Sequence, residues 1–239
     1  MKMYYIRRRY LLLLILLPLM LCLLLLLQDW RPGREALSMP LVGLTVVVDA
    51  GHGGADPGVV GVSGVLEKDI NLAVAQKLAA LLENAGATVI MTRDADLFLG
   101  ENKRGDLQAR VDAAVGADLL ISVHGNSFPQ QSSSCGAQVF YASNNAAGER
   151  LAVALQKCLA AVSADGHRQA LPHASSYLLK HCSCPAVVAE VGFLSNAAEE
   201  RQLTDDAYQW QLAWAMLEGI VAYRQDGSAE NAVGNQEYL

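Results

Sequence analysis

One stretch of the chain indicates both the type of fold and the position of a candidate functional site: Val46-Val47-Val48-Asp49-Ala50-Gly51-His52-Gly53-Gly54. Residues 44–48 are apolar on both alternating faces, which is typical of a strand buried in a parallel sheet. The glycines that follow let the backbone turn and expose the ring of His52. We therefore predict a buried strand that presents a histidine at its carboxyl end.

Strand-like and helix-like segments alternate along the rest of the chain. A helix is predicted from Leu66 to Ala85, where apolar residues form one stripe and Gly86 ends the pattern. Further strands are predicted at 87–92, 119–123, 137–141, 177–179 and 186–189, and further helices at 107–115, 148–162 and 205–223. This alternation indicates an α/β fold, a mostly parallel central sheet flanked by helices on both faces.

Four residues with metal-binding or acid–base side chains stand at the ends of these segments. His52, His124 and Glu190 follow predicted strands, and Glu67 opens the first predicted helix. The carboxyl ends of parallel strands form the edge where α/β sheets bind ligands, so these side chains are expected to converge. Two imidazoles and one carboxylate are a usual ligand set for catalytic zinc. A further glutamate, free of the metal, can serve as general base.

The segments around these residues resemble the signature of the zinc-dependent N-acetylmuramoyl-L-alanine amidases, the Amidase_3 family. The resemblance runs from about Leu44 to about Tyr223. Ala50 departs from it, because the family more often has proline before the Gly-His-Gly-Gly segment, but this position is not a ligand. With a short N-terminal anchor and no added wall-binding domain, the chain most resembles the CwlD-type amidases of spore-forming bacteria.

The resemblance implies a mechanism and a substrate. One zinc ion is expected, held by His52, Glu67 and His124. Glu190 is expected to act as the catalytic general base. The implied reaction is hydrolysis of the amide between N-acetylmuramic acid and L-alanine in peptidoglycan. For CwlD-type members it further implies a role in spore cortex maturation, through muramic-δ-lactam formation, and in germination. Two alternatives stay open: a zinc peptidase that acts within stem peptides, and an inactive homologue that binds the wall.

Other polar residues near the site have more than one interpretation. Asp49 is expected either to hold a ring N–H of a ligand histidine or to cap nearby loop amides. Asn126 is expected to orient the substrate or its own loop. Arg93 and Arg110 are predicted to be surface or salt-bridged residues rather than catalytic ones.

The remaining histidines and cysteines show no second metal pattern. His167 and His173 are predicted to be solvated loop residues, with the lining of a substrate groove as the alternative. Cys182 and Cys184 lack the second ligand pair of a structural zinc site, so we interpret them as small residues in a loop. A disulfide between these two would be strained, whereas Cys135 with either stays open.

Composition limits the partners of the protein. The net charge of -6 provides no basic stripe for nucleic acid. Gly51-His52-Gly53-Gly54 lacks the lysine and hydroxyl of a phosphate-binding loop. The segments 93–106 and 129–136 are too short for the helical insert that can block the zinc in cell-division members of the family. Any control is therefore expected to come from an activating protein partner or from the timing of expression.

The N-terminus predicts attachment to a membrane. Lys2, Arg7, Arg8 and Arg9 precede an apolar run from Leu11 to Leu27, which is about long enough to span a bilayer as a helix. The basic flank should stay cytoplasmic, which places the rest of the chain outside the cytoplasm, for example in the forespore intermembrane space. The alternative is a cleaved signal peptide and a secreted enzyme.

Four parts follow from these predictions. They are a basic start and transmembrane or signal-anchor segment at 1–27, a linker at 28–43, a zinc amidase catalytic domain at 44–225 and a loose C-terminal tail at 226–239.

Overall fold

The computed structural model describes residues 17–20 and 39–234 of the chain and contains two compact units, Met1–Ser38 and Met39–Leu239. Residues 17–20 are helical, and the other residues of the predicted anchor lie outside the described part of the chain. Within 17–20 and 39–234, no helix combines the length and the apolar character needed to cross a membrane.

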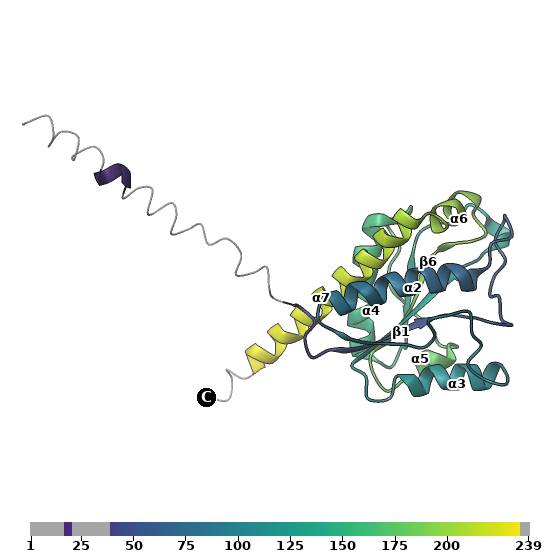
Figure 1. Ribbon diagram of the computed structural model, residues 1–239, viewed down its shortest axis with the longest axis horizontal. Helices are drawn as coiled ribbons and strands as arrows, with labels where there is room; N and C mark the ends of the chain where they lie inside the picture. The colour runs from purple at the N-terminus through teal and green to yellow at the C-terminus, as the bar shows by residue number, and fades with distance from the viewer. Residues whose placement is uncertain (1–16, 21–38, 235–239) are drawn as a thin grey trace, which may run out of the picture. The chain divides into compact units, whose positions relative to one another are not determined.

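A six-stranded sheet forms the centre of the second unit (Figure 1). Its strands are β1 (Thr45–Ala50), β2 (Thr88–Met91), β3 (Leu119–Asn126), β4 (Gln138–Tyr141), β5 (Leu171–Pro172) and β6 (Ala186–Phe193). Their spatial order is β2-β1-β3-β6-β4-β5. Only the β4–β6 pair is antiparallel within the described sheet, so the prediction of a mostly parallel sheet is confirmed.

Helices cover both faces of this sheet, as predicted. They are α2 (Glu67–Asn84), α3 (Lys103–Ala113), α4 (Ala146–Val162), α5 (Tyr177–His181), α6 (Ala197–Leu203) and α7 (Asp206–Gly234), with a 3-10 turn at Pro129–Gln131. The larger apolar core lies between the sheet and α2, α4 and α7, and a smaller one lies between the sheet and α3 and α5. Figure 1 shows these two groups of helices on opposite sides of β1.

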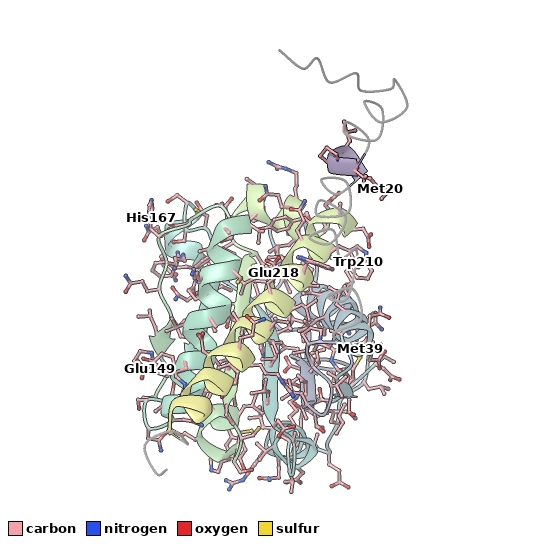
Figure 2. All side chains as sticks on the ribbon, turned by 90° about the vertical axis from the view of Figure 1, so that its left-hand side faces the viewer. Met20, Met39, Glu149, His167, Trp210 and Glu218 are labelled. Carbon is pink, nitrogen blue, oxygen red and sulfur yellow. The ribbon has the colours of Figure 1, made fainter. Side chains whose placement is uncertain are left out.

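Helices α4 and α7 lie side by side in the larger core (Figure 2). Leu151, Leu155 and Leu159 recur every four residues on α4 and are fully buried. A Cβ atom at Gly219 of α7 would lie 2.7 Å from Leu155 Cα, so a glycine is needed for this approach. Truncating a leucine such as Leu155 to alanine is expected to cost about 2–5 kcal/mol of stability.

Residues 177–179, predicted as a strand, instead form part of the short helix α5. The hydroxyl of Ser176 accepts a hydrogen bond from Leu179 N at 3.3 Å and so caps the helix. Leu178 and Leu179 are both buried in the smaller core. Three residues are too few to distinguish a period of 2 from one of 3.6, which is why the prediction was wrong.

Three further differences concern short or terminal elements. The two-residue strand β5 and the helix α6 were not predicted. Asn196 caps α6 by accepting from Ala198 N at 2.9 Å, a start signal that the sequence does contain. The closing helix continues to Gly234, so residues 226–234 are helical where a loose tail was predicted.

Candidate active site

The loop after β1 carries His52 and is closed on itself. Gly53 N donates to Asp56 O at 3.0 Å, and Asp56 N donates to Gly53 O at 3.1 Å. His52 has a φ of 62°, a left-handed conformation that is uncommon for a residue with a Cβ atom. Its ring centroid lies 5.0 Å from that of His124. A Cβ atom at Gly51 would lie 2.2 Å from His124 Cε1, so the glycine leaves room for the second ring.

Three candidate metal ligands converge at the carboxyl edge of the sheet. His124 lies in β3, and Glu67 is the first residue of α2. Glu67 Oε1 lies 3.1 Å from His52 Nε2 and 3.0 Å from His124 Nδ1. The ligand atoms of all three residues lie within 4.8 Å of one another. The structure thus brings together the three residues that the sequence predicts as ligands, and their metal-binding role stays a prediction.

The carboxylate of Glu67 is buried and surrounded by donors. Its Oε1 also accepts from Gly125 N at 3.1 Å and from Asn71 Nδ2 at 3.2 Å, and its Oε2 accepts from Val59 N at 2.8 Å. Burial alone raises the pKa of Glu67, but its contacts with His124 and His52 outweigh this effect and hold the pKa well below its usual value. Glu67 is therefore a permanent anion at neutral pH.

The arrangement around His52 fits a cation. Its Nδ1 lies 2.9 Å from Asp56 Oδ2, while its Nε2 faces Glu67. A neutral imidazole has one N–H and cannot donate to both carboxylates. If Nδ1–H donates to Asp56, the lone pair of Nε2 points at an anion, and a metal ion between them would satisfy both. Two imidazoles and one carboxylate are also the donors that zinc prefers.

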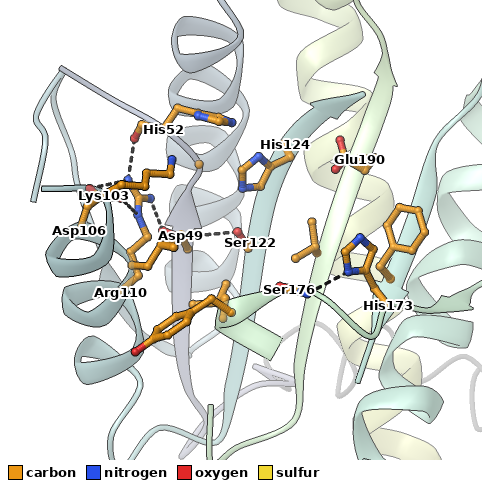
Figure 3. A pocket seen from close by; sticks show the side chains of 16 residues that line it. Asp49, His52, Lys103, Asp106, Arg110, Ser122, His124, His173, Ser176 and Glu190 are labelled. Atoms are coloured by element: carbon orange, nitrogen blue, oxygen red, sulfur yellow. Dashed lines mark hydrogen bonds and ion pairs between the residues drawn. The ribbon is translucent and has the colours of Figure 1, made fainter. Parts of the chain in front are cut away.

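Glu190 lies opposite His124 on the neighbouring strand β6. Its Oε2 is buried and has no hydrogen-bond partner among the described residues. Burial raises the pKa of Glu190 to about 7, and the negative charge of Glu67 adds to this effect. Figure 3 shows His124 and Glu190 facing the same pocket. Glu190 can therefore hold or release a proton near neutral pH.

Asp49 supports the site in a way that neither interpretation of the sequence foresaw. Its carboxylate accepts from Ser122 Oγ at 2.5 Å, Thr92 Oγ1 at 2.6 Å and Arg110 Nη1 at 2.6 Å. Burial raises the pKa of Asp49, but Arg110 and the two hydroxyls hold it below its usual value. Among the described residues, its partners are thus two hydroxyls and a guanidinium rather than a histidine ring or loop amides.

Arg93 and Arg110 bind the backbone carbonyls of the His52 loop. Arg110 donates to the carbonyls of Ala50 and His52 at 2.8 and 2.7 Å. Arg93 donates to the carbonyls of Ala50 and Gly51 at 2.8 and 2.9 Å. Both are 3% exposed. The prediction that these arginines are surface or salt-bridged residues is confirmed for Arg110, which pairs with Asp49 and with the carboxylate at position 106, whereas a surface position is wrong for Arg93.

Asp56 and Lys103 are the site residues that the sequence did not single out. Asp56 accepts from His52 Nδ1 and forms an ion pair with Lys103. Burial alone raises the pKa of Asp56, but the bonds from Lys103 and His52 lower it to about 2. An ionised carboxylate on the outer nitrogen of a ligand histidine fixes the tautomer and the ring orientation. The available signal was an aspartate four residues after His52 in a glycine-rich loop.

Asn126 organises the chain beyond His124. Its Oδ1 accepts from Ser127 N at 2.7 Å, and its carbonyl accepts from Leu194 N at 2.8 Å. The latter bond links the end of β3 to the segment after β6. These contacts support its predicted role in orienting the loop, and its role toward substrate stays a prediction.

A pocket of about 250 Å³ opens beside these residues (Figure 3). One end contains His52, His124 and Glu190, and the other end lies between α3 and α5. Its remaining lining residues are Asp49, Gly51, Lys103, Asp106, Leu107, Arg110, Ser122, Phe140, His173, Ser176, Tyr177, Leu178 and Val188. His173 therefore lines a groove, which was the alternative interpretation of that residue. The pocket extends the site from the candidate metal ligands onto a wall that is more apolar than polar.

The chain matches the model of the Amidase_3 family, N-acetylmuramoyl-L-alanine amidase, over residues 46–222. It is 37% identical over 204 residues to the germination-specific N-acetylmuramoyl-L-alanine amidase of Bacillus subtilis (strain 168). This match covers 81% of this chain and 84% of the relative. The matched family segment includes His52, Glu67, His124 and Glu190.

Solved structures with the same fold include two amidases. The CwlD amidase from Clostridioides difficile, in complex with the GerS lipoprotein, has a TM-score of 0.69 and 37% identity. The match covers 75% of this chain and 98% of that one. The catalytic domain of CwlV from Bacillus (Paenibacillus) polymyxa var. colistinus has a TM-score of 0.67 and 34% identity, with 75% and 97% of the two chains covered.

Proposed function

The chain belongs to the N-acetylmuramoyl-L-alanine amidase family and is an enzyme of that activity on peptidoglycan, and from this premise we propose that zinc is its metal, that Glu190 is its general base and that spore cortex is its substrate. The observation that carries the proposed mechanism is the convergence of three candidate ligand atoms within 4.8 Å of one another. One of the three residues, His124, is paired across the sheet with Glu190, whose Oε2 is buried and has no hydrogen-bond partner among the described residues. His52, His124 and Glu190 all line the same pocket.

His52, Glu67 and His124 would hold the zinc. Bound there, zinc would supply Lewis-acid chemistry, lowering the pKa of water toward neutrality and polarising the substrate carbonyl. Asp56 keeps the Nδ1–H of His52 engaged, so that Nε2 presents its lone pair to the metal side. Arg93 and Arg110 hold the carbonyls on both sides of Gly51, which keeps the His52 loop in place.

Glu190 would move the proton of the reaction. Its unpartnered Oε2 accepts a proton from the attacking water and orients that water toward the carbonyl of the lactyl group. The same oxygen then delivers the proton to the nitrogen of L-alanine. An amine is a poor leaving group unless it is protonated, so Glu190 serves both the attack and the breakdown. A raised pKa suits this double role, because the group must accept and return a proton near neutral pH.

Digestion of purified peptidoglycan tests the reaction. The expected products are glycan strands with free muramic-acid carboxyl groups and stem peptides with a new L-alanine amino end. Mass spectrometry of the fragments identifies both ends. Cleavage inside the stem peptide would instead identify a peptidase, and an unchanged polymer with retained binding would identify a wall-binding protein.

The cortex proposal rests on the relatives. One is named for germination, and the solved CwlD structure contains the GerS lipoprotein, which motivates the proposal of an activating partner for this chain as well. Deleting the gene in a sporulating host should leave growth intact, remove muramic-δ-lactam from the cortex and impair outgrowth. Normal δ-lactam content in mutant spores, with no redundant amidase present, would refute the cortex role and leave the amidase activity standing.

We further propose that the enzyme is membrane-anchored, with its catalytic domain outside the cytoplasm. The support is the basic start and the apolar run from Leu11 to Leu27. Membrane fractionation and protease accessibility of the full-length protein test this. A mature N-terminus near residues 37–39 would reveal a cleaved signal peptide and a secreted enzyme.

A further inference from the structure

Two cysteines that the amidase chemistry does not use lie side by side between α5 and β6. Cys182 caps the C-terminal end of α5, and Cys184 stands two residues before β6 begins at Ala186. The backbone bends at this point, and the two Sγ atoms lie 3.3 Å apart. Both are free thiols. The other end of α5 lines the substrate pocket through Tyr177 and Leu178, so the pair lies one short helix away from the pocket.

The two thiols differ in their access to solvent. Cys184 is 6% exposed and belongs to the small apolar core that also contains Leu178, Leu179 and Leu120. Cys182 is half-buried at the rim of this core. A small molecule in solution therefore meets Cys182 first. Cys184 can reach Cys182 only from inside the apolar core.

They also differ in acidity. The hydrogen bond from the Cys184 thiol lowers the pKa of Cys182 to about 7, and the same bond raises the pKa of Cys184. Cys182 is therefore a thiolate in a large share of the molecules at neutral pH. The thiolate is the nucleophilic form of cysteine, and a pKa near the ambient pH is the best compromise between ionisation and nucleophilicity.

We propose that Cys182 and Cys184 form a thiol–disulfide exchange site, which cycles between a dithiol and an internal disulfide by reaction with low-molecular-weight disulfides. Cys182 Sγ attacks one sulfur of the small disulfide, forms a mixed disulfide and releases one thiolate. Cys184 loses its proton to solvent, attacks Cys182 Sγ and expels the second thiolate. Two protein thiols are thereby oxidised, and one small disulfide is reduced to two thiols.

The short loop makes this disulfide labile. The sulfur atoms must approach from 3.3 Å to a bond of about 2.05 Å, within a ring that contains only one residue between the cysteines. Strain in so small a ring raises the reduction potential, and strained disulfides are the exchangeable ones rather than the structural ones. The bridge is thus expected to form with oxidised glutathione and to open again with reduced glutathione.

Peptide mapping of the full-length protein tests the site. The protein is incubated with oxidised glutathione, alkylated and cut with trypsin. Cleavage after Lys180 and Arg201 yields one peptide that contains Cys182 and Cys184 and no other cysteine. We expect most of this peptide to lose two hydrogens and to take up no alkylating reagent. Reduced glutathione should restore two alkylated cysteines.

Serine variants separate the two steps. Cys184→Ser should stop at a glutathione adduct on Cys182, and Cys182→Ser should give neither adduct nor bridge. Cys158→Ser is the matched control, since Cys158 is a half-buried thiol on α4 whose pKa is raised, and it should leave the bridge unchanged. The proposal is overturned if the native protein retains glutathione on Cys182, or if both thiols stay open to alkylation after oxidation.

Discussion

Glu67 and Glu190 are two glutamates at the same edge of the sheet, and their surroundings are opposite. Glu67 accepts hydrogen bonds from three donors outside the histidines, at Val59, Asn71 and Gly125, and it faces two imidazoles as well. The Oε2 of Glu190 has no partner among the described residues, although this atom is buried. Burial raises the pKa of both groups, but only Glu67 has enough donors to reverse that effect.

The surroundings of the two glutamates suit one residue type to two roles. A carboxylate held by many donors stays ionised and fixed, which suits a metal ligand. A carboxylate without donors keeps a pKa near neutral and a free lone pair, which suits a general base. The number of donors around each carboxylate therefore separates the proposed ligand from the proposed base, although both are glutamates.

Removing the metal ligands should produce the largest effect. His52→Ala and His124→Ala should each lose the zinc and, with it, all measurable amidase activity. Treatment of the native protein with a chelator should have the same effect. Metal analysis of the purified domain should find about one zinc per chain before treatment. Full zinc occupancy in both variants would break the assignment of this cluster as the metal site.

Exchanging the two glutamates for glutamine tests the comparison directly. Glu190→Gln should keep the zinc and lose about a hundredfold or more in turnover, because a general base contributes on that scale. Glu67→Gln, the matched variant, should weaken zinc binding instead, because it removes a charged ligand. If Glu190→Gln turned over substrate at a near-normal rate, another residue would have to move the proton.

The pH dependence of stability should report Glu190 in the metal-free protein. Its pKa is about 7 in the folded state against an ordinary value of 4.5, so the unfolded chain releases this proton at a lower pH. The contribution of Glu190 to the free energy of unfolding is therefore fully present below pH 4.5 and is lost as the pH rises through about 7, a change of about 3 kcal/mol.

Urea unfolding of the chelated native protein and of Glu190→Gln, at pH 4.5 and pH 7.5, measures this effect. The two proteins differ at this one residue, so the difference between the two pH profiles reports Glu190. Parallel profiles would show that the pKa of Glu190 is the same in the folded and the unfolded chain, and the raised pKa that distinguishes Glu190 from Glu67 would be absent.

The smallest effect is expected at Asp56, which contacts Nδ1 of His52, the ring nitrogen that faces away from Glu67. Asp56→Ala should weaken zinc binding by about 10–100-fold, because His52 loses the partner that fixes its tautomer. Asp56→Asn, which keeps an acceptor, should recover part of this loss. Asp96→Ala is a suitable control, since Asp96 also binds the loop, at Gly54 N, without contacting the ring. Equal zinc affinity in all three variants would remove Asp56 from the site.

The sequence predicted the parts of the molecule that local patterns encode. The buried β1 segment with its glycines, the stripe of α2 and the position of His124 after an apolar run were each visible in a short window. Residues 177–179 were assigned wrongly because three residues carry no period. Asp56 and Lys103 were missed because their ion pair joins positions 47 residues apart, and Arg110 lies 61 residues from Asp49.

Local patterns in the sequence therefore suffice to identify the chemical groups at the strand ends, and hence the groups that meet at one edge of the sheet. The behaviour of each group depends on contacts that form only when the chain folds. The carboxylate of Glu67 is well supplied with hydrogen-bond donors because β3 places His124 and the amide of Gly125 beside it, from positions 57 and 58 residues away. The Oε2 of Glu190 has no partner among the described residues because the packing around β6 buries this atom and offers it no donor. Donor number and burial depend on folding as a whole, so no pattern of residue types can encode them locally.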